Sequence, residues 1–347
     1  MTQPTLNFDD LTPRTLDVGD RIKDFEFPDA TGKHVMLDHM TLFGRPVVLH
    51  VTGDDAAARR ELAALRDGFL PFGRLGVGVV AITRLSNDAL RDVFEGRRPP
   101  FALLPDPPGQ LFAYLGVDPG GPAHILVAGP DLRVSHRLVA HDGGSALGEA
   151  LAACTARLAP AEDRLVGMQP PVLLLGDVFS PALCERLIEY WRRRGDRMVD
   201  VVASGEAGGN VYDPGMKRRI DVPIDDPKLA GLIAELLKRR VIGEIHRYFG
   251  YAVREGETLK IGCYEATNEG RFKMHRDNNA GANLQRRFAM SLNLNDDFEG
   301  GILRFPEFPG IAYKPGVGAA VVFSCSLLHE ATPVIRGRRF GVFGFFW

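Results

Sequence analysis

Cysteine is scarce in this sequence, and the few cysteines present are scattered. Only four occur among 347 residues, at Cys154, Cys184, Cys263 and Cys325, and no two stand in a CxxC pair. This spacing argues against a disulfide framework and against a zinc site built from cysteines. We interpret each as a small buried apolar residue, which fits a reducing cytoplasm as the expected compartment.

Long apolar runs and an excess of one charge are also missing. No run reaches the ~18 residues of a membrane-spanning helix, and the polar, acidic start MTQPTLNFDD does not resemble a signal peptide. The 42 basic and 44 acidic side chains nearly cancel, to a net charge of -2. We therefore expect neither a nucleic-acid partner nor a membrane partner. A hydrophobic content of 45% over 347 residues predicts two globular domains, each with its own core.

The first half of the chain alternates strand-like and helix-like segments. Short apolar runs at Pro46–Thr52 and Val77–Thr83 predict buried strands, and Asp55–Phe69 between them has helical spacing. His124–Leu138 predicts a hairpin, because a Gly-Pro-Asp turn divides it, and Ser145–Leu158 predicts a closing helix. Alternation of this kind predicts an α/β layer with a central sheet.

A stretch rich in proline and polar residues, 161–171, follows this half. We predict a linker here, with one domain over residues 1–160 and a second over residues 172–347. The second domain opens with two predicted helices, each begun by a capping residue followed by proline, at Ser180-Pro181 and Asp226-Pro227. After them come only short alternating strands separated by glycine and proline turns. Such a pattern predicts a mostly β domain, an antiparallel sandwich or barrel with supporting helices.

His275, Asp277 and His329 are the candidate metal ligands. His275 and Asp277 stand two apart in a strand pattern, so both side chains are expected on one face. His329 lies 54 residues after His275, at the start of another predicted strand. Two imidazoles and one carboxylate on one face of a metal leave open positions and suit non-heme Fe(II). On spacing alone, however, ordinary surface or core histidines are the better interpretation.

The motifs around these residues change that balance. In chain order they are a strand with Tyr264, HRD at His275–Asp277, SLNLNDDFEGGILRFPE at Ser291–Glu307, KPGVGAAVVF at Lys314–Phe323 and HEATPVIRGRR at His329–Arg339. Together they resemble the prolyl 4-hydroxylase-like group of Fe(II)/2-oxoglutarate dioxygenases, well over roughly the last 90 residues and more loosely over 170–347. The resemblance implies a double-stranded β-helix, or jelly roll, supported by the two upstream helices.

The resemblance also implies roles for individual residues. The three metal candidates correspond to the iron ligands and hence to the catalytic residues. Arg339 corresponds to the basic residue that holds the distal carboxylate of 2-oxoglutarate through its fork of donors. Arg336 and Arg338 stand beside it and remain alternatives for that contact. Tyr264 is either a hydrogen-bond partner of the same carboxylate or a core tyrosine.

The activity implied is hydroxylation of a C–H bond coupled to decarboxylation of 2-oxoglutarate to succinate and CO₂. Fe(II), 2-oxoglutarate and O₂ are the implied cofactors, with ascorbate as a candidate reductant. Because Asp277 is present, hydroxylation is favoured over halogenation, in which halide takes the place of the carboxylate. The expected substrate is a prolyl or other peptidyl side chain, or a small molecule. A thiol-independent redox adaptor and a non-catalytic jelly-roll binding protein are the alternative functions.

Two glycine-rich segments near these motifs have expected structural roles. Gly300-Gly301 is expected to let the barrel backbone bend, and it is given no role in the site. Val201–Arg219, which contains Gly205, Gly208 and Gly209, is either a lid over the site or merely a long loop.

The first half resembles a peroxiredoxin-type thioredoxin fold. The resemblance rests on Leu16–Leu37, Val47–Thr52, Phe101–Val117 and His124–Val134. Peroxiredoxins carry a reactive cysteine on the first turn after the first central strand, where the helix N-terminus lowers its pKa. Here that loop, Thr52–Ala57, reads TGDDAA and contains no cysteine. We therefore expect a redox-inactive domain kept for packing, substrate presentation or dimerisation, with a homodimer through it as one option.

Overall fold

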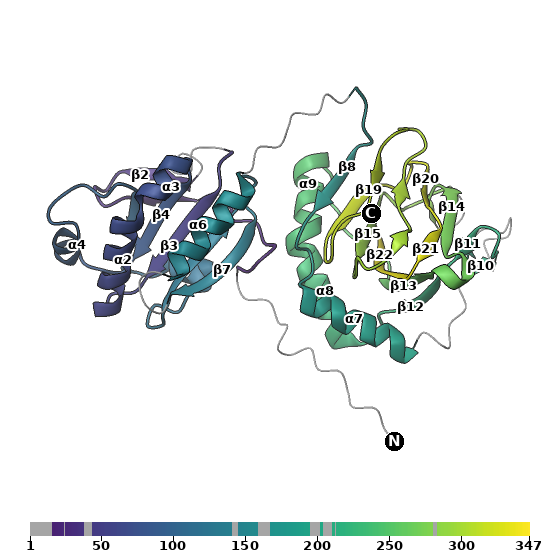
Figure 1. Ribbon diagram of the computed structural model, residues 1–347, viewed down its shortest axis with the longest axis horizontal. Coiled ribbons are helices and arrows are strands. Elements are labelled where there is room, and N and C mark those ends of the chain that lie inside the picture. The colour runs from purple at the N-terminus through teal and green to yellow at the C-terminus, as the bar shows by residue number, and fades with distance from the viewer. Residues whose placement is uncertain are drawn as a thin grey trace, which may run out of the picture. The chain divides into compact units, whose positions relative to one another are not determined.

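The computed structural model describes residues 16–23, 25–37, 44–140, 145–158, 167–194, 202–203, 210–211, 213–279 and 283–347. The chain divides into two compact units, Pro13–Asp163 and one that contains Arg164–Trp347 (Figure 1). Much of the linker predicted at 161–171 lies outside the described residues, so the domain limits stay a prediction. Within the described residues, none of the helices is both long and apolar enough to cross a membrane.

A five-stranded sheet forms the centre of the N-terminal unit. Its order is β5-β4-β3-β6-β7; the first three of these strands run parallel, and each of the last two is antiparallel to its neighbour. The strands are β3 (Val47–Thr52), β4 (Gly78–Thr83), β5 (Ala102–Pro105), β6 (Ala123–Ala128) and β7 (Val134–Ala140). Its central strands are buried on both faces, which is why they read as nearly continuous apolar runs in the sequence.

The two faces of this sheet carry separate cores. Val48 and Ile125 pack on one face with the helices α2 (Ala56–Gly68), α3 (Leu70–Leu75), α4 (Asn87–Val93) and α6 (Ser145–Arg157). Leu49 and Leu126, one residue along each strand, pack on the other face with α5 (Gln110–Leu115) and the hairpin β1 (Glu26–Pro28)–β2 (His34–Met36). This arrangement confirms the predicted thioredoxin-like α/β fold.

Two antiparallel sheets form the barrel of the C-terminal unit. The larger sheet has the order β12-β13-β22-β15-β19-β8 and the smaller β11-β14-β20-β17-β18. The larger contains β8 (Val172–Leu175), β12 (Ile220–Pro223), β13 (Lys260–Glu265), β15 (Phe288–Asn293), β19 (Ala320–Ser324) and β22 (Arg338–Phe346). The smaller contains β11 (Lys217–Arg218), β14 (Arg271–His275), β17 (Leu303–Arg304), β18 (Ala312–Tyr313) and β20 (His329–Ala331). The predicted jelly roll is therefore confirmed.

Two further strand pairs accompany these sheets, β9 (Val202–Ala203) with β10 (Asn210–Val211) and β16 (Glu299–Gly300) with β21 (Val334–Arg336). The pairing of β16 with β21 shifts register at Gly300, and Gly300 and Gly301 have φ angles of 72° and 58°. Glycine adopts such positive angles without the strain that a Cβ would cause. The predicted bend at this pair is thus confirmed.

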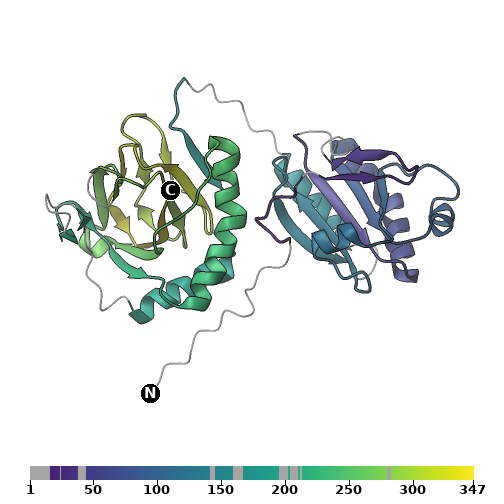
Figure 2. The same cartoon turned by 180° about the vertical axis from the view of Figure 1, so that it is seen from behind.

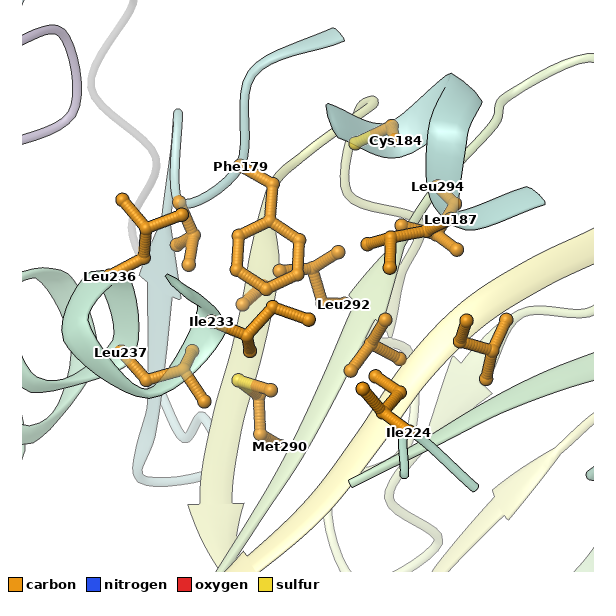
Figure 3. Close-up of a cluster of buried hydrophobic side chains, with 14 of the residues drawn as sticks. Phe179, Cys184, Leu187, Ile224, Ile233, Leu236, Leu237, Met290, Leu292 and Leu294 are labelled. Carbon is orange, nitrogen blue, oxygen red and sulfur yellow. The ribbon is translucent and has the colours of Figure 1, made fainter. Parts of the chain in front are cut away.

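Helices cover the outer face of the larger sheet (Figures 1 and 2). They are α7 (Pro181–Arg194), α8 (Pro227–Leu237), a π-helical turn η3 (Lys238–Ile242) and α9 (Gly243–Phe249). Ser180 Oγ accepts from the Leu183 N–H at 3.3 Å and Asp226 Oδ1 accepts from the Leu229 N–H at 2.9 Å, so both predicted helix starts are confirmed. Figure 3 shows Leu187 of α7 and Ile233 of α8 beside the sheet residues Met290 and Leu292.

Candidate active site

His275, Asp277 and His329 are brought together inside the barrel. Their ligand atoms all lie within 4.8 Å of one another. Nε2 of His275 lies 3.3 Å from one carboxylate oxygen of Asp277, and Nε2 of His329 lies 3.3 Å from the other. All three side chains are largely shielded from solvent. Three residues spread over two distant motifs thus present two nitrogen atoms and a carboxylate to one point.

A β-bulge in β14 directs His275 into the barrel. Phe272 pairs with Ala331 and His275 pairs with His329, so three residue steps on β14 match two steps on β20. An extra residue in one strand of a pair reverses the face to which the following side chain points. Phe272 and His275 therefore share a face, and their rings stack with centroids 3.5 Å apart and planes inclined by 20°.

Asp277 lies beyond the end of β14, in a turn, and this corrects the expectation that it shares a strand with His275. Strand alternation therefore does not position the carboxylate. Instead, the Asp277 N–H donates to the carbonyl of Cys325 at 3.0 Å, and Arg286 Nη1 donates to the Asp277 carbonyl at 3.3 Å. These two hydrogen bonds of its own backbone hold Asp277 close to both imidazoles.

Hydrogen bonds fix the tautomers of both histidines. Nδ1 of His275 lies 2.7 Å from the Lys273 carbonyl, and Nδ1 of His329 lies 2.9 Å from the Leu327 carbonyl. A carbonyl oxygen only accepts, so each Nδ1 carries the proton and each Nε2 presents a lone pair. Within the described residues the buried Nε2 of His275 has no hydrogen-bond partner. Lone pairs that face a carboxylate repel it unless a cation lies between them, so this donor set fits a divalent metal such as Fe(II).

The pKa values of His329 and Asp277 favour the metal-binding protonation states at neutral pH. Burial lowers the pKa of His329, and the carboxylate of Asp277 only partly opposes this. Burial would by itself raise the pKa of Asp277, but His329, His275 and Arg286 outweigh it and leave that pKa below its ordinary value. Neutral imidazole and ionised carboxylate are the forms that bind metal.

An ion pair links the two segments that carry the ligands. Arg276, inside the HRD motif, lies 2.8 Å from Oε1 of Glu307 and also donates to the Ser326 carbonyl. Oε2 of Glu307 accepts from the Leu328 N–H at 2.8 Å, directly before His329. The Glu307 carboxylate therefore holds the turn after β14 against the turn before β20.

Arg339 enters the barrel from β22, next to Tyr264 of β13. Its Nε donates to Asn293 Oδ1 at 3.1 Å and its Nη2 donates to Ser291 Oγ at 2.9 Å, and the residue is only 2% exposed. Because Nε is engaged, a bound carboxylate would be held at the Nη1–Nη2 end of the guanidinium. A Cβ on Gly301 would lie 3.1 Å from Cδ of Arg339, so this glycine, given no role from the sequence, makes room for the arginine stem.

The neighbouring arginines lie on the surface. Arg338 pairs with Glu265 at 2.9 Å, and Arg336 pairs with Glu299. Their side chains are 57% and 77% exposed. Of the three arginines considered for the co-substrate carboxylate, Arg339 is therefore the one that faces the interior.

Tyr264 is fully buried and shares its hydroxyl with an arginine that the sequence did not single out. Arg219 Nη1 donates to the Tyr264 hydroxyl at 3.1 Å, and Arg219 Nη2 also donates to Asp221 Oδ2 at 2.7 Å. A phenolic oxygen that accepts one hydrogen bond still has its own proton to donate. Burial raises the pKa of Tyr264, so the hydroxyl keeps that proton and is suited to donate to a carboxylate.

Lys217, Arg219 and Asp221 were not predicted from the sequence as site residues. Lys217–Arg218 forms β11 and Asp221 lies in β12, whereas this end of Val201–Arg219 was expected to belong to a lid or loop. Two strands of two and four residues are too short to show periodicity. The alternation of Lys217, Arg219 and Asp221 at every second position was the available signal. Gly205, Gly208 and Gly209 lie outside the described residues.

The loop after β3 in the N-terminal unit is the segment that the sequence resemblance matches to the peroxiredoxin active loop. Asp55 caps α2, since its Oδ1 accepts from the Ala58 N–H at 2.7 Å. A hollow of about 460 Å³ lies beside it, lined in part by Gly53, Ala57 and Pro122. Cys154, the only cysteine of this half of the sequence, is buried in α6, and burial raises the pKa of its thiol to about 11.

The fold and the donor set together define the class of the C-terminal unit as a jelly-roll domain with a two-histidine, one-carboxylate centre. Residues 259–347 match the 2OG-Fe(II) oxygenase superfamily, and residues 18–133 match the AhpC/TSA family. The chain therefore carries a peroxiredoxin-like AhpC/TSA domain followed by a 2OG-Fe(II) oxygenase domain.

Similar solved structures include prolyl hydroxylases and a peroxidoxin. A Pseudomonas putida prolyl-4-hydroxylase is 18% identical over 51% of this chain and 92% of its own, with a TM-score of 0.39. A Trichoplax adhaerens prolyl hydroxylase, in complex with a hypoxia inducible factor peptide fragment, is 14% identical over 51% and 83%, with a TM-score of 0.40. Peroxidoxin BcpB from Mycobacterium tuberculosis is 25% identical over 41% and 97%, with a TM-score of 0.37. No curated protein matches the chain.

Proposed function

We propose that this protein is an Fe(II)- and 2-oxoglutarate-dependent dioxygenase that hydroxylates a C–H bond and converts 2-oxoglutarate to succinate and CO₂. The observation that carries the proposal is the convergence of His275, Asp277 and His329, whose ligand atoms lie within 4.8 Å of one another. One oxygen atom of O₂ would enter the substrate and the other would enter succinate. A prolyl or other peptidyl side chain and a small molecule are both candidate substrates.

Bound Fe(II) would supply the redox chemistry, and the residues of the chain would hold and orient the reactants. His275, Asp277 and His329 would hold the metal, and a set of two imidazoles and one carboxylate would leave positions open for the 2-oxo acid and O₂. Arg339 would receive the distal carboxylate of 2-oxoglutarate at its Nη1–Nη2 end, and Tyr264 would donate its hydroxyl hydrogen to the same group. This contact orients the co-substrate before the reaction.

Aromatic side chains around the centre would exclude water. The rings of Phe323 and Phe305 lie 4.7 Å and 6.3 Å from the ring of His329, between centroids. Phe272 covers one face of His275. An apolar wall on this side limits side reactions with solvent and strengthens the polar contacts that remain inside.

We further propose that the AhpC/TSA domain works without thiol chemistry. The support is the loop Thr52–Ala57, which lacks cysteine, and the burial of Cys154. Peroxide consumption by the iron-free protein, compared with a Cys154→Ser variant, tests this idea. We expect no consumption above the buffer rate in either protein, and consumption lost in the variant would contradict it. A role in substrate presentation or in a homodimer remains a proposal for this domain.

Anaerobic titration of the apo-protein with Fe(II) and 2-oxoglutarate tests the proposed function. Wild type should develop the visible metal-to-ligand charge-transfer band of an iron-bound 2-oxo acid. His275→Ala should abolish the band, and Arg339→Ala should move its midpoint to at least tenfold higher 2-oxoglutarate, since a charge-assisted pair is lost. Succinate release in air would then identify substrates.

Two matched controls sharpen this titration. His246→Ala removes an exposed histidine of α9, and Arg338→Ala removes the exposed neighbour of Arg339. Both should keep the wild-type band and midpoint. A folded wild-type protein that shows no band would contradict the oxygenase proposal and favour a non-catalytic jelly-roll binding protein.

A further inference from the structure

Lys217, Arg219 and Asp221 form a charged group inside the barrel, here called the basic cluster. Lys217 pairs with Phe272 across β11 and β14, and paired residues on neighbouring strands point to the same face. Phe272 in turn stacks on His275. Nζ of Lys217 lies 5.4 Å from the centre of the Phe272 ring. One aromatic side chain therefore separates the ammonium group from a candidate metal ligand.

The basic cluster also reaches the larger sheet. Nζ of Lys217 lies 2.9 Å from Asp221 Oδ2, and this ion pair joins β11 of the smaller sheet to β12 of the larger. Register runs from Asp221 through Gly262 and Gly341 to Asn293, which accepts a hydrogen bond from Arg339. The basic cluster thus lies along the wall between the metal ligands and the arginine proposed for the co-substrate.

Glycine in β13 makes room for these charges. A Cβ on Gly262 would lie 2.7 Å from Cδ of Arg219 and 2.7 Å from Oδ1 of Asp221. A Cβ atom essentially never lies within 3.0 Å of a non-bonded heavy atom, so any larger residue would displace the guanidinium or the carboxylate. Glycine inside a strand is otherwise unfavourable, because it has no side chain to pack. The strand therefore gives up packing where it accommodates the basic cluster.

Stability does not explain why three charges are buried here. The side chains of Lys217, Arg219 and Asp221 are only 6%, 9% and 10% exposed. Burying ions costs free energy, and well-packed apolar residues are often as stable or more so. Arg219 is accounted for by its contact with Tyr264. The basic cluster contains two cations, Lys217 and Arg219, and only one carboxylate, Asp221. The Lys217 ammonium group, which lies beside the centre, is therefore suited to bind an anion that enters the barrel.

We propose that the basic cluster binds the carboxylate of the primary substrate through Lys217, and that this substrate is a small organic acid. The inference rests on the proposed function, since it assigns the substrate class of the same site. The carboxylate would accept a hydrogen bond from the Lys217 ammonium group, with the C–H bond to be hydroxylated near the metal. The interior of an uncharged peptide carries no carboxylate for Lys217 to bind.

The test uses the full-length protein loaded with Fe(II) and 2-oxoglutarate in the absence of O₂. Binding is measured from the change in the charge-transfer band when probes are added. The probes are acids and their uncharged amides: hexanoate with hexanamide, N-acetyl-L-proline with N-acetyl-L-prolinamide, and N-acetyl-L-leucine with N-acetyl-L-leucinamide. We expect the acid of at least one pair to bind at least tenfold more tightly than its amide.

Two variants show whether Lys217 causes the preference for the acid over its amide. Lys217→Met keeps most of the stem and removes the charge, so it should reduce the preference to less than threefold while the affinity for 2-oxoglutarate stays within twofold. Arg218→Met is the matched control, because Arg218 is the next residue of β11 and pairs with Glu269 instead of the basic cluster. It should keep the full preference.

Each outcome separates this inference from the proposed function. Equal binding of acids and amides, no binding of any acid, or a preference that survives in Lys217→Met would overturn the basic cluster as a substrate site. Preferential binding of a capped, uncharged prolyl peptide would overturn it in favour of a peptidyl substrate. Loss of the band itself in wild type would overturn the proposed function. If Lys217→Met does not fold, the comparison of acid and amide in wild type still decides.

Discussion

Phe272 and His275 stack on each other inside the barrel, with ring centroids 3.5 Å apart and planes inclined by 20°. The imidazole is also held at Nδ1 by the Lys273 carbonyl, 2.7 Å away. One contact fixes the plane of the ring and the other fixes its rotation within that plane. The direction of Nε2 is therefore set by the chain before any metal binds, which is how a first shell is preorganised by its supporting residues.

Phe272→Ala should weaken Fe(II) binding by about 10–100-fold, although every ligand remains, because residues that orient ligands typically contribute this much. Fe(II) titration under anaerobic conditions measures the effect. Phe249→Ala is the control, since Phe249 packs on Phe288 in the helix-facing core and contacts no candidate ligand in the described structure. Equal iron affinity in Phe272→Ala and wild type would show that the stack does not position His275.

Glu307→Gln should lower Fe(II) affinity about tenfold with little effect on folding. The substitution removes the charge that joins Arg276 to the segment before His329. Because this pair is partly exposed, the free energy of unfolding should change little. Glu299→Gln breaks the exposed pair with Arg336 instead and should leave iron affinity unchanged. Identical iron affinities of the two variants would count against the link.

Gly262→Ala should weaken 2-oxoglutarate binding about tenfold or more. The added Cβ would displace Arg219, which donates to Tyr264, and overpacking of this kind costs on the order of 1–3 kcal/mol of unfolding free energy. Titration with 2-oxoglutarate and urea unfolding measure the two effects. Gly231→Ala in α8 is the control, because nothing lies within 4 Å of its added Cβ, and it should be neutral or stabilising by up to about 1 kcal/mol. Normal 2-oxoglutarate affinity in Gly262→Ala would contradict the prediction.

Protonation of His329 should weaken iron binding only below pH 6.5. Burial places the pKa of His329 below its ordinary value of 6.5, so this imidazole stays neutral in the folded protein when a free one begins to protonate. Protons therefore compete with the metal only once the pH drops through the lowered pKa. Titrations with Fe(II) at a series of pH values check this. A decline that begins well above pH 6.5 would contradict it.

The N-terminal unit should lose stability on mild acidification because of His50. This residue of β3 is fully buried, neither ring nitrogen has a partner within the described residues, and burial lowers its pKa to about 4. Its folded pKa is depressed, so the unfolded chain takes up the proton first. The stability present above pH 6.5 is lost as the pH falls toward 4, by on the order of 3 kcal/mol.

Hydrogen exchange of Val47–Thr52 measures this loss, since both tryptophans lie in the other unit, at 191 and 347. Exchange should accelerate between pH 7 and pH 5 beyond the intrinsic pH effect. His50→Leu should remove the acceleration, because a leucine has no proton to gain. An unchanged pH dependence in that variant would place the effect on other groups.

The sequence predicts the architecture better than the details of the site. Capping residues Ser180 and Asp226 mark helix starts through local chemistry, so they can be recognised without the rest of the fold. Arg339, and not Arg336, points inward because Arg339 pairs with Tyr264. The spacing of the arginines in the sequence does not specify this pairing. Lys217 was missed because its strand has two residues and exists only by pairing with β14.

The bulge in β14 makes the metal centre depend on strand pairing as well as on residue identity. If the same residues paired regularly with β20 from Phe272 onward, Met274 would lie opposite His329 and the His275 imidazole would turn toward the outside of the sheet. Such a protein would keep an intact HRD motif, a distant His329 and all its barrel strands, yet would lack the centre. For chains of this kind, the residues that maintain this bulge are therefore as informative about activity as the ligands themselves.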